Sequence, residues 1–201
     1  MKKLKFIIQL FLLLIYSMGC TPTKDVFNEK LTLYEANKKY PFGQPNVKAL
    51  PEIKEYDKLI GNCTCKSIQY IAGKAGDTLD LKWRWRYILN GYGVQDEGWF
   101  GNDTIQSAFI SIRTLNPITK KWHVPFFTPN MMGAPNIWVG GKEGKKIVLK
   151  RNQKTQNGGE VESILTFSNI TEKGFFWEGK IVNSQNNSTN IFWKIWCIKD
   201  K

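Results

Sequence analysis

A two-residue alternation of side-chain character runs through residues 79–89 and restricts this part of the chain to a β-strand. Successive side chains of a strand point to opposite faces of a sheet, so this sequence has one apolar and one polar face. The pair Asn90-Gly91 that follows is the strongest short signal for a hairpin turn. The apolar face consists of Leu79, Leu81, Trp83, Trp85, Tyr87 and Leu89, and the polar face of Asp80, Lys82, Arg84 and Arg86.

The same texture continues to the end of the chain, in short runs of aromatic and β-branched residues separated by Gly, Asn and Pro. Many short strands without a long helical pattern indicate an antiparallel meander, either a barrel or a sandwich. We predict an all-β, antiparallel up-and-down β-barrel of about 8 to 10 strands. The predicted strands are residues 63–72, 79–89, 92–99, 105–114, 121–127, 137–140, 146–151, 161–169, 174–182 and 190–198.

One short N-terminal helix is predicted before the strands. In the segment PEIKEYDKLI, residues 51–60, the apolar side chains recur at helical spacing, and Pro51 stands at the first helical position. Gly61 ends the helix. We therefore assign residues 51–201 to the barrel domain and the polar residues 20–50 to a tether with little structure of its own.

The first 19 residues have the features of an export signal. Lys2, Lys3 and Lys5 precede an apolar run over residues 6–16, which is shorter than the about 20 residues that a membrane-spanning helix needs. We predict a signal peptide over residues 1–19, and its removal lowers the net charge from +12 to +9. This basic balance suits anionic lipid headgroups, acidic glycans or a merely solvated surface, and export excludes cytoplasmic nucleic acid as a partner.

The residues at the predicted cleavage site, Ser17-Met18-Gly19-Cys20, resemble the lipobox of bacterial lipoproteins. In that class the cysteine is lipidated and becomes the first residue, and Leu is usual where this chain has Ser17. The resemblance implies lipidation of Cys20 in the cell envelope, and Thr21 in the sorting position implies the outer membrane. Ser17 and Gly19 also satisfy the rule for ordinary cleavage, which would give an unlipidated periplasmic or secreted protein.

Several motifs follow one another along the predicted barrel: Asp57-Lys58-Leu59-Ile60-Gly61, then Trp85-Arg86-Tyr87-Ile88-Leu89-Asn90-Gly91, Val94-Gln95-Asp96, and Arg113-Thr114-Leu115-Asn116-Pro117 with Lys121-Trp122. Their order, over residues 57–198, resembles the lipocalin-like barrels of domain-of-unknown-function family 1579. Cys63 stands where that family has a Trp in the first strand, and Asn116 replaces its usual Asp. The resemblance implies a calycin-type up-and-down barrel. It implies no catalytic residue, because the family has no established common activity.

Three cysteines besides Cys20 lie in the predicted barrel. Cys63 and Cys65 share one face of the first strand, and Cys197 lies on the last strand, which an up-and-down barrel pairs with the first. In an oxidising compartment a disulfide from Cys63 or Cys65 to Cys197 is expected, and three buried free thiols are the alternative. We predict no metal site, because these residues and His123 include no CxxC pair and no second histidine.

Aromatic side chains on the predicted inner faces suit a small-molecule pocket. Small barrels either fill their interior with side chains or hold one small ligand, and both alternatives stay open here. We predict a non-catalytic, cofactor-free site for a small hydrophobic or amphipathic ligand. The loop 128–136, with the adaptable Met131 and Met132, is either a lid or an ordinary connection. The predicted ligand-binding residues are Trp83, Trp85, Tyr87, Trp122, Phe126 and Trp177.

Two other classes of function would use different residues. A hydrolase or isomerase in the same cavity needs a pair of titratable groups, for which Asp96, Glu97 and Glu178 are candidates at a separation that the sequence does not fix. The chain has no catalytic-triad, phosphate-loop or metalloprotease signature, which favours binding over catalysis. A glycan-binding module would stack sugars on exposed rings, with Trp99 and Trp138 in glycine-rich stretches as candidates.

Overall fold

The computed structural model describes residues 32–101, 107–131, 133–155 and 158–201. The predicted signal peptide over residues 1–19, Cys20 and Met132 lie outside the described residues. Residues from Tyr34 to Lys201 form one compact unit with its own core, which is what independent folding requires. No helix within the described ranges is long and apolar enough to cross a membrane.

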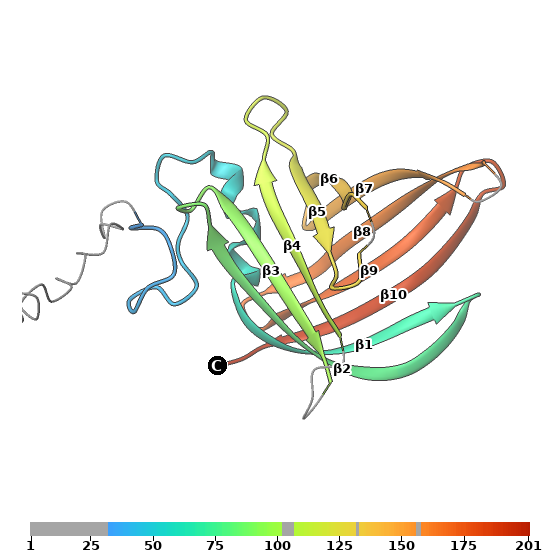
Figure 1. Cartoon of the computed structure of the whole chain (residues 1–201), viewed down its shortest axis with the longest axis horizontal. Helices are drawn as coiled ribbons and strands as arrows, with labels where there is room; N and C mark the ends of the chain where they lie inside the picture. Colours follow the sequence, from blue (N-terminus) through green and yellow to red (C-terminus); the bar gives the residue numbers. More distant parts are fainter. Residues whose placement is uncertain (1–31, 102–106, 132, 156–157) are drawn as a thin grey trace, which may run out of the picture. The chain divides into compact units, whose positions relative to one another are not determined.

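The described part of this unit contains ten antiparallel strands, each paired with the next, and β1 pairs with β10 to close the sheet (Figure 1). This arrangement confirms the predicted all-β up-and-down barrel, and each predicted strand has its counterpart. The strands are β1 (Gly61–Ile71), β2 (Lys74–Ile88), β3 (Gly93–Phe100), β4 (Ser107–Leu115), β5 (Trp122–Phe127), β6 (Asn136–Glu143), β7 (Lys146–Lys154), β8 (Glu160–Thr171), β9 (Gly174–Asn183) and β10 (Ser188–Lys199).

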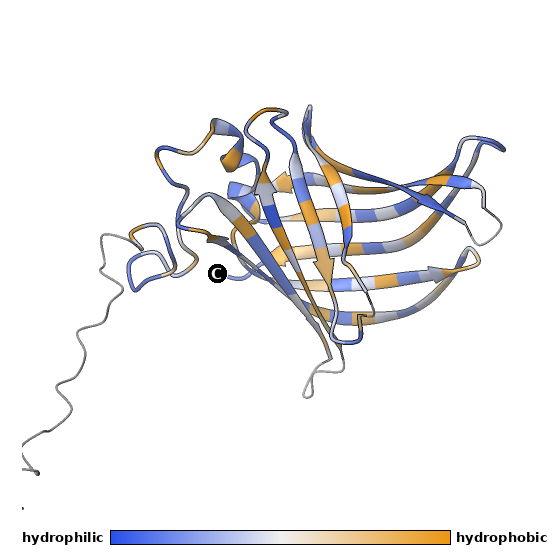
Figure 2. Cartoon of the chain, turned by 45° about the horizontal axis from the view of Figure 1, so that its top comes forward, coloured by the Kyte–Doolittle hydropathy of each residue, from blue (hydrophilic) through white to orange (hydrophobic). Residues whose placement is uncertain are grey.

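The alternation predicted for β2 is present in its second half, where Leu81, Trp83, Trp85 and Tyr87 are buried. Hydrophilic and hydrophobic residues alternate along several strands of the barrel, as Figure 2 shows. Leu79 and Leu89 differ from the prediction, because both are exposed. Leu89 lies past the end of β2 with a φ of 54°, so it belongs to the turn and no longer follows the strand period.

Residues 34–50 differ from the predicted tether, since they contact the turn between β2 and β3. The Asn46 backbone N–H donates to the Gly91 carbonyl at 3.0 Å, and the Tyr34 N–H donates to Asn90 Oδ1 at 3.1 Å. The reason is that this turn presents backbone and amide groups that need partners, and the segment supplies them.

The predicted helix is a 3₁₀ helix, η1 (Pro51–Leu59), and it covers one end of the barrel (Figure 1). Its buried side chains are Ile53, Tyr56 and Leu59, and their spacing of three matches the three residues per turn of a 3₁₀ helix. The Tyr56 ring lies 4.9 Å from the Trp122 ring and 5.8 Å from the Trp85 ring, measured between centroids. We refer to this end as the helix end and to the opposite end as the far end.

The seam between the first and last strands carries a disulfide between Cys65 and Cys197, which are direct partners in the β1–β10 register. The third candidate, Cys63, is a buried free thiol. Burial raises the pKa of the Cys63 thiol to about 12. The seam that closes the barrel is thus also held covalently.

Candidate functional site

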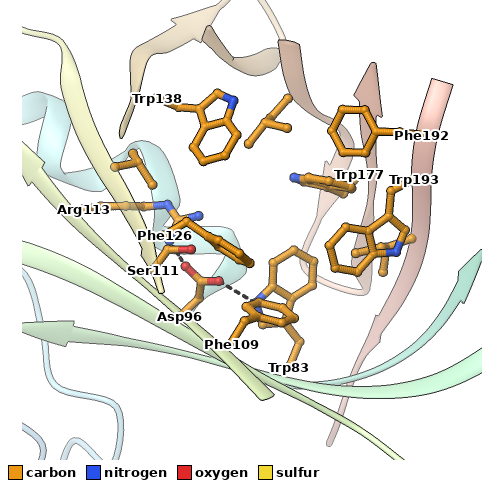
Figure 3. A pocket seen from close by; sticks show the side chains of 13 residues that line it. Trp83, Asp96, Phe109, Ser111, Arg113, Phe126, Trp138, Trp177, Phe192 and Trp193 are labelled. Atoms are coloured by element: carbon orange, nitrogen blue, oxygen red, sulfur yellow. Dashed lines mark hydrogen bonds and ion pairs between the residues drawn. The ribbon is translucent and has the colours of Figure 1, made fainter. Parts of the chain in front are cut away.

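The barrel encloses a cavity of about 120 Å³ between the core beneath η1 and the far end (Figure 3). Most of its lining is aromatic or aliphatic, and the polar groups come from β3 and β4. Phe126, Phe192 and Trp193 are only partly buried, so the cavity lies close to solvent on this side. The lining residues are Trp83, Asp96, Phe109, Ser111, Arg113, Val124, Phe126, Trp138, Leu165, Trp177, Phe192, Trp193 and Ile195.

The predicted ligand-binding residues lie at two depths of the barrel. Trp83, Phe126 and Trp177 line the cavity. Trp85, Tyr87 and Trp122 are buried in the core but are absent from the lining. Residues two apart on a strand lie about 6.5 Å apart along its axis, so Trp85 sits one step closer to η1 than Trp83 does. Period two gives the face of a residue, while its depth depends on where η1 inserts.

The rings of Phe192 and Trp193 both line the cavity, although strand alternation would place neighbouring side chains on opposite faces. The register of β10 against β9 shifts between Ile191 and Trp193, and this bulge lets neighbouring side chains both reach the cavity. The Trp193 ring lies 5.2 Å from the Trp177 ring, and its Nε1 donates to Ser67 Oγ at 2.7 Å. The bulge therefore adds one ring to the wall.

Two glycines make room for rings of the cavity wall. A Cβ on Gly98 would collide with the Phe109 ring, and one on Gly179 would lie 2.5 Å from Phe192 Cζ. Each glycine lies on a strand next to the ring-bearing strand. These positions are sequence signals for close approach inside a strand.

A buried ion pair between Asp96 and Arg113 lies on the cavity wall nearest η1 (Figure 3). The Asp96 side chain is fully buried and the Arg113 side chain is 3% exposed. Trp83 Nε1 donates to Asp96 Oδ2 at 2.7 Å. The Arg113 guanidinium lies 4.4 Å from the Trp85 ring centre and 5.1 Å from that of Tyr56. The Trp85 and Tyr56 rings thus hold the ion pair from the helix end. We call the Asp96–Arg113 pair the polar floor of the cavity.

Burial shifts the pKa values of Arg113 and of the adjacent Tyr56 in opposite directions. It lowers the pKa of Arg113, which nevertheless stays protonated because guanidinium groups do not deprotonate in proteins. It raises the pKa of the Tyr56 phenol, and the neighbouring Arg113 charge acts against that rise. At neutral pH the polar floor thus consists of one cation and one carboxylate, and the phenol next to it is neutral.

The three carboxylates considered for acid/base chemistry do not face one another. Asp96 points into the barrel, whereas Glu97 accepts from Arg84 Nε at 2.7 Å on the outer face. Glu178 lies 3.8 Å from the ammonium of Lys194, and both side chains alternate with the inward residues of their strands. Among the described lining residues Asp96 is the sole carboxylate. This geometry does not favour a two-carboxylate enzyme site.

Comparisons of the whole chain give likeness in fold only. No family model and no curated protein matches the sequence. The crystal structure of Rv2717c from M. tuberculosis superposes with a TM-score of 0.53 and 7% identity, covering 77% of this chain and 100% of that one. The fold is lipocalin-like. An S-type phycobiliprotein lyase, CPES from Guillardia theta, aligns with a TM-score of 0.48 and 9% identity over 73% of this chain and 90% of the lyase.

The remaining candidates take ordinary places in the lipocalin-like barrel. Trp138, a candidate exposed ring for sugar stacking, is instead buried on β6 and lines the cavity, which corrects that candidacy. Trp99 is partly covered by the Arg84 guanidinium, 5.0 Å from its ring centre. Within the described ranges no three His, Cys, Asp or Glu side chains gather as a metal site. Met131, in the loop 128–136 that is predicted as either a lid or an ordinary connection, is partly buried between β5 and β6.

Proposed function

We propose that this protein is a cell-envelope lipoprotein whose barrel binds a small hydrophobic or amphipathic molecule without chemistry. The observation that carries the proposal is the cavity, which has aromatic walls and a few fixed polar groups, as ligand pockets usually do. Its volume of about 120 Å³ lies below the roughly 300 to 1,000 Å³ of pockets for drug-sized ligands. An apolar cavity of about 150 Å³ binds benzene, so the buried part of the ligand has about the size of one ring.

The local geometry of the wall supports binding over a solid core. Gly98 leaves room for the Phe109 ring against β3, and the bulge between Ile191 and Trp193 brings the neighbouring Phe192 ring to the lining. Both rings therefore lie along the wall of the cavity, where a ligand of one-ring size would contact them.

We also place the chain in domain-of-unknown-function family 1579 as a proposal. Its support is the order of the motifs and a contact between two of them. Asp96 belongs to the Val94-Gln95-Asp96 motif, and its partner Arg113 opens the Arg113-Thr114-Leu115-Asn116-Pro117 motif. Motif residues that join in one buried ion pair are what a shared fold signature would contain.

The lipid anchor on Cys20, with outer-membrane sorting through Thr21, is the third part of the proposal. The compact unit begins at Tyr34, whose backbone N–H donates to Asn90 Oδ1 at the helix end. The turns between strands at the helix end carry lysines, namely Lys120, Lys121, Lys145 and Lys173. Each lysine near an anionic bilayer adds about 1 kcal/mol of attraction, which supports an anchored protein with this end toward the membrane.

A basic surface groove of about 540 Å³ beside η1 gives the same end a further cluster of cations. Its carboxylates are engaged inward, since Glu55 accepts from Trp122 Nε1 at 2.9 Å and Asp57 accepts from the Tyr87 hydroxyl. Lys58 lies 3.8 Å from Glu172, and within the described ranges no other lining lysine forms an ion pair, although the Lys142 backbone N–H donates to Glu55 Oε2 at 3.0 Å. The lining lysines are Lys54, Lys58, Lys142, Lys145 and Lys146.

Native mass spectrometry of protein purified from its own envelope tests the binding. We expect one small co-purifying molecule per chain, lost after Trp83→Ala and retained after Trp99→Ala, because Trp83 lines the cavity and Trp99 does not. A protein that arrives empty and binds an apolar probe equally well after Trp83→Ala would contradict the proposal.

Metabolic labelling with a radioactive fatty acid tests the anchor separately. We expect label on the wild-type chain and none on Cys20→Ser, whose export should continue. Absence of label from the wild-type protein recovered from the envelope would reject lipidation and leave the periplasmic or secreted alternative.

A further inference from the structure

One arginine beside the cavity has no carboxylate partner within the described ranges. Arg151 lies on β7 on the same face as the buried Ile147 and Leu149, so it points into the barrel toward the far end. Its guanidinium carbon lies 4.7 Å from the ring centre of Trp138, which lines the cavity. The Trp138 indole therefore joins the cation to the apolar wall.

The Arg151 guanidinium is oriented by neutral groups. Its Nη1 donates to Asn136 Oδ1 at 2.6 Å, and its Nη2 donates to Gln153 Oε1. Its Nε is buried without a hydrogen-bond partner in the described structure. Partial burial lowers the pKa of Arg151, because removal from water disfavours the charged form. This contrasts with Arg113, whose charge is balanced by Asp96.

Among the described residues around Arg151, few acidic side chains are placed to neutralise its charge. Described residues of the far-end connections, at 72–73, 101, 128–131, 133–135, 155, 158–159 and 184–187, include no charged side chain. The nearest acidic position on the neighbouring strand, Glu162, is paired with Asn152, and its side chain alternates with the inward Ser163 that faces Arg151 across the ladder. Among the described residues in and beside the cavity, two arginines, Arg113 near η1 and Arg151 toward the far end, thus face the interior against one carboxylate, Asp96.

We propose that the ligand is an anionic amphiphile, a small organic carboxylate whose apolar group fills the cavity and whose carboxylate binds Arg151. This inference rests on the proposed function and names its ligand class. A guanidinium fork matches the two oxygens of a carboxylate, and a fork already held by Asn136 and Gln153 loses little freedom on binding. The cavity admits one ring, and the carboxylate then lies toward the far end, where the Arg151 guanidinium stacks on the Trp138 ring.

Isothermal titration of residues 34–201 with 4-phenylbutyrate and with the neutral 4-phenylbutan-1-ol tests the inference. We expect the carboxylate to bind about tenfold more tightly than the alcohol, as a charge-assisted bond at a partly buried site provides. Arg151→Gln should remove this preference and leave the alcohol affinity unchanged. Lys150→Gln is the matched control, because it removes the same charge from the exposed face of the same strand and should change neither affinity.

The outcomes separate the inference from the proposed function. Equal affinities for the two probes in the wild-type chain would overturn the carboxylate and leave the apolar pocket intact. Binding of neither probe would overturn both. Should Arg151→Gln unfold, Arg151→Lys keeps the charge without the fork, and we expect it to retain a reduced preference for the carboxylate. An undiminished preference in a folded Arg151→Gln variant would also overturn the assignment.

Discussion

Neutralising Asp96 should strongly destabilise the barrel, because it leaves a buried cation without its counter-charge. The substitution Asp96→Asn keeps the shape of the side chain and one oxygen that can accept from Trp83 Nε1. It removes the charge that faces Arg113, whose side chain is 3% exposed and cannot recover solvation from water. Breaking a buried ion pair in this way costs about 3 to 5 kcal/mol.

We expect the lower part of that range, about 3 kcal/mol, because the asparagine oxygen still offers an acceptor. With a urea dependence of about 2 kcal/mol per molar, this loss lowers the urea midpoint by about 1.5 M. Tryptophan fluorescence reports the transition directly, since Trp83 and Trp85 lie against the ion pair. The loss is a large part of the roughly 5 to 15 kcal/mol that stabilises a typical domain.

Two further variants show whether the charge is the cause. Glu97→Gln removes the next carboxylate of β3, whose side chain is 11% exposed, and should cost less than Asp96→Asn because its partner Arg84 is 42% exposed and can recover solvation from water. Adding Arg113→Met to Asp96→Asn removes the stranded cation and should recover at least part of the loss. The lost charge is not the cause if Asp96→Asn costs no more than Glu97→Gln, or if Arg113→Met destabilises the Asp96→Asn variant by as much as it destabilises the wild type.

Three more predictions concern the seam and the wall. Reduction of the Cys65–Cys197 disulfide should lower the free energy of unfolding by about 2 to 5 kcal/mol, seen as a lower urea midpoint in dithiothreitol. An equal midpoint in Cys197→Ser without reductant and in the oxidised wild type would contradict the bridge. The raised pKa of Cys63, about 12 when folded, contributes stability that is complete below the ordinary value near 9 and is lost as pH rises toward 12. Alkaline urea titrations should therefore show a steeper fall for wild type than for Cys63→Ala, and equal slopes would argue against a buried thiol. Gly98→Ala should push Phe109 into the cavity, costing about 1 to 3 kcal/mol and weakening probe binding, which unchanged affinity would disprove.

The sequence predicts the closed sheet well because the strand period is encoded in each strand. The alternation in β2 and the turn at Asn90-Gly91 are local patterns, and together they predict the β2–β3 hairpin. Pro51 and the apolar spacing predict the helix. Its position over one end of the barrel depends on the contact between the Tyr56 and Trp85 rings. That contact joins distant parts of the chain, and no local pattern specifies it.

The candidate site is predicted less completely, because depth and register are tertiary properties. Trp83 and Trp85 look equivalent in sequence, yet only Trp83 reaches the cavity. The Asp96–Arg113 pair follows from the β3–β4 register, which sets Asp96 opposite Ser111, one step along the same face from Arg113. The sequence did contain a signal for this pair. Arg113 is an even number of residues from the inward Phe109, and Asp96 is an even number from the inward Phe100, so alternation places both charges inside the barrel.

The most direct test of the binding cavity is a titration of an apolar probe of one-ring size, such as toluene, into the wild-type chain and a filled variant. Leu165→Trp adds a larger side chain to the lining, whereas Ile164→Trp makes a comparable change on the opposite face of β8. We expect saturable binding of one probe per wild-type chain, its loss in Leu165→Trp, and no change in Ile164→Trp. Absence of saturable binding in the wild type, or equal binding in the filled variant, would contradict a ligand site inside the barrel.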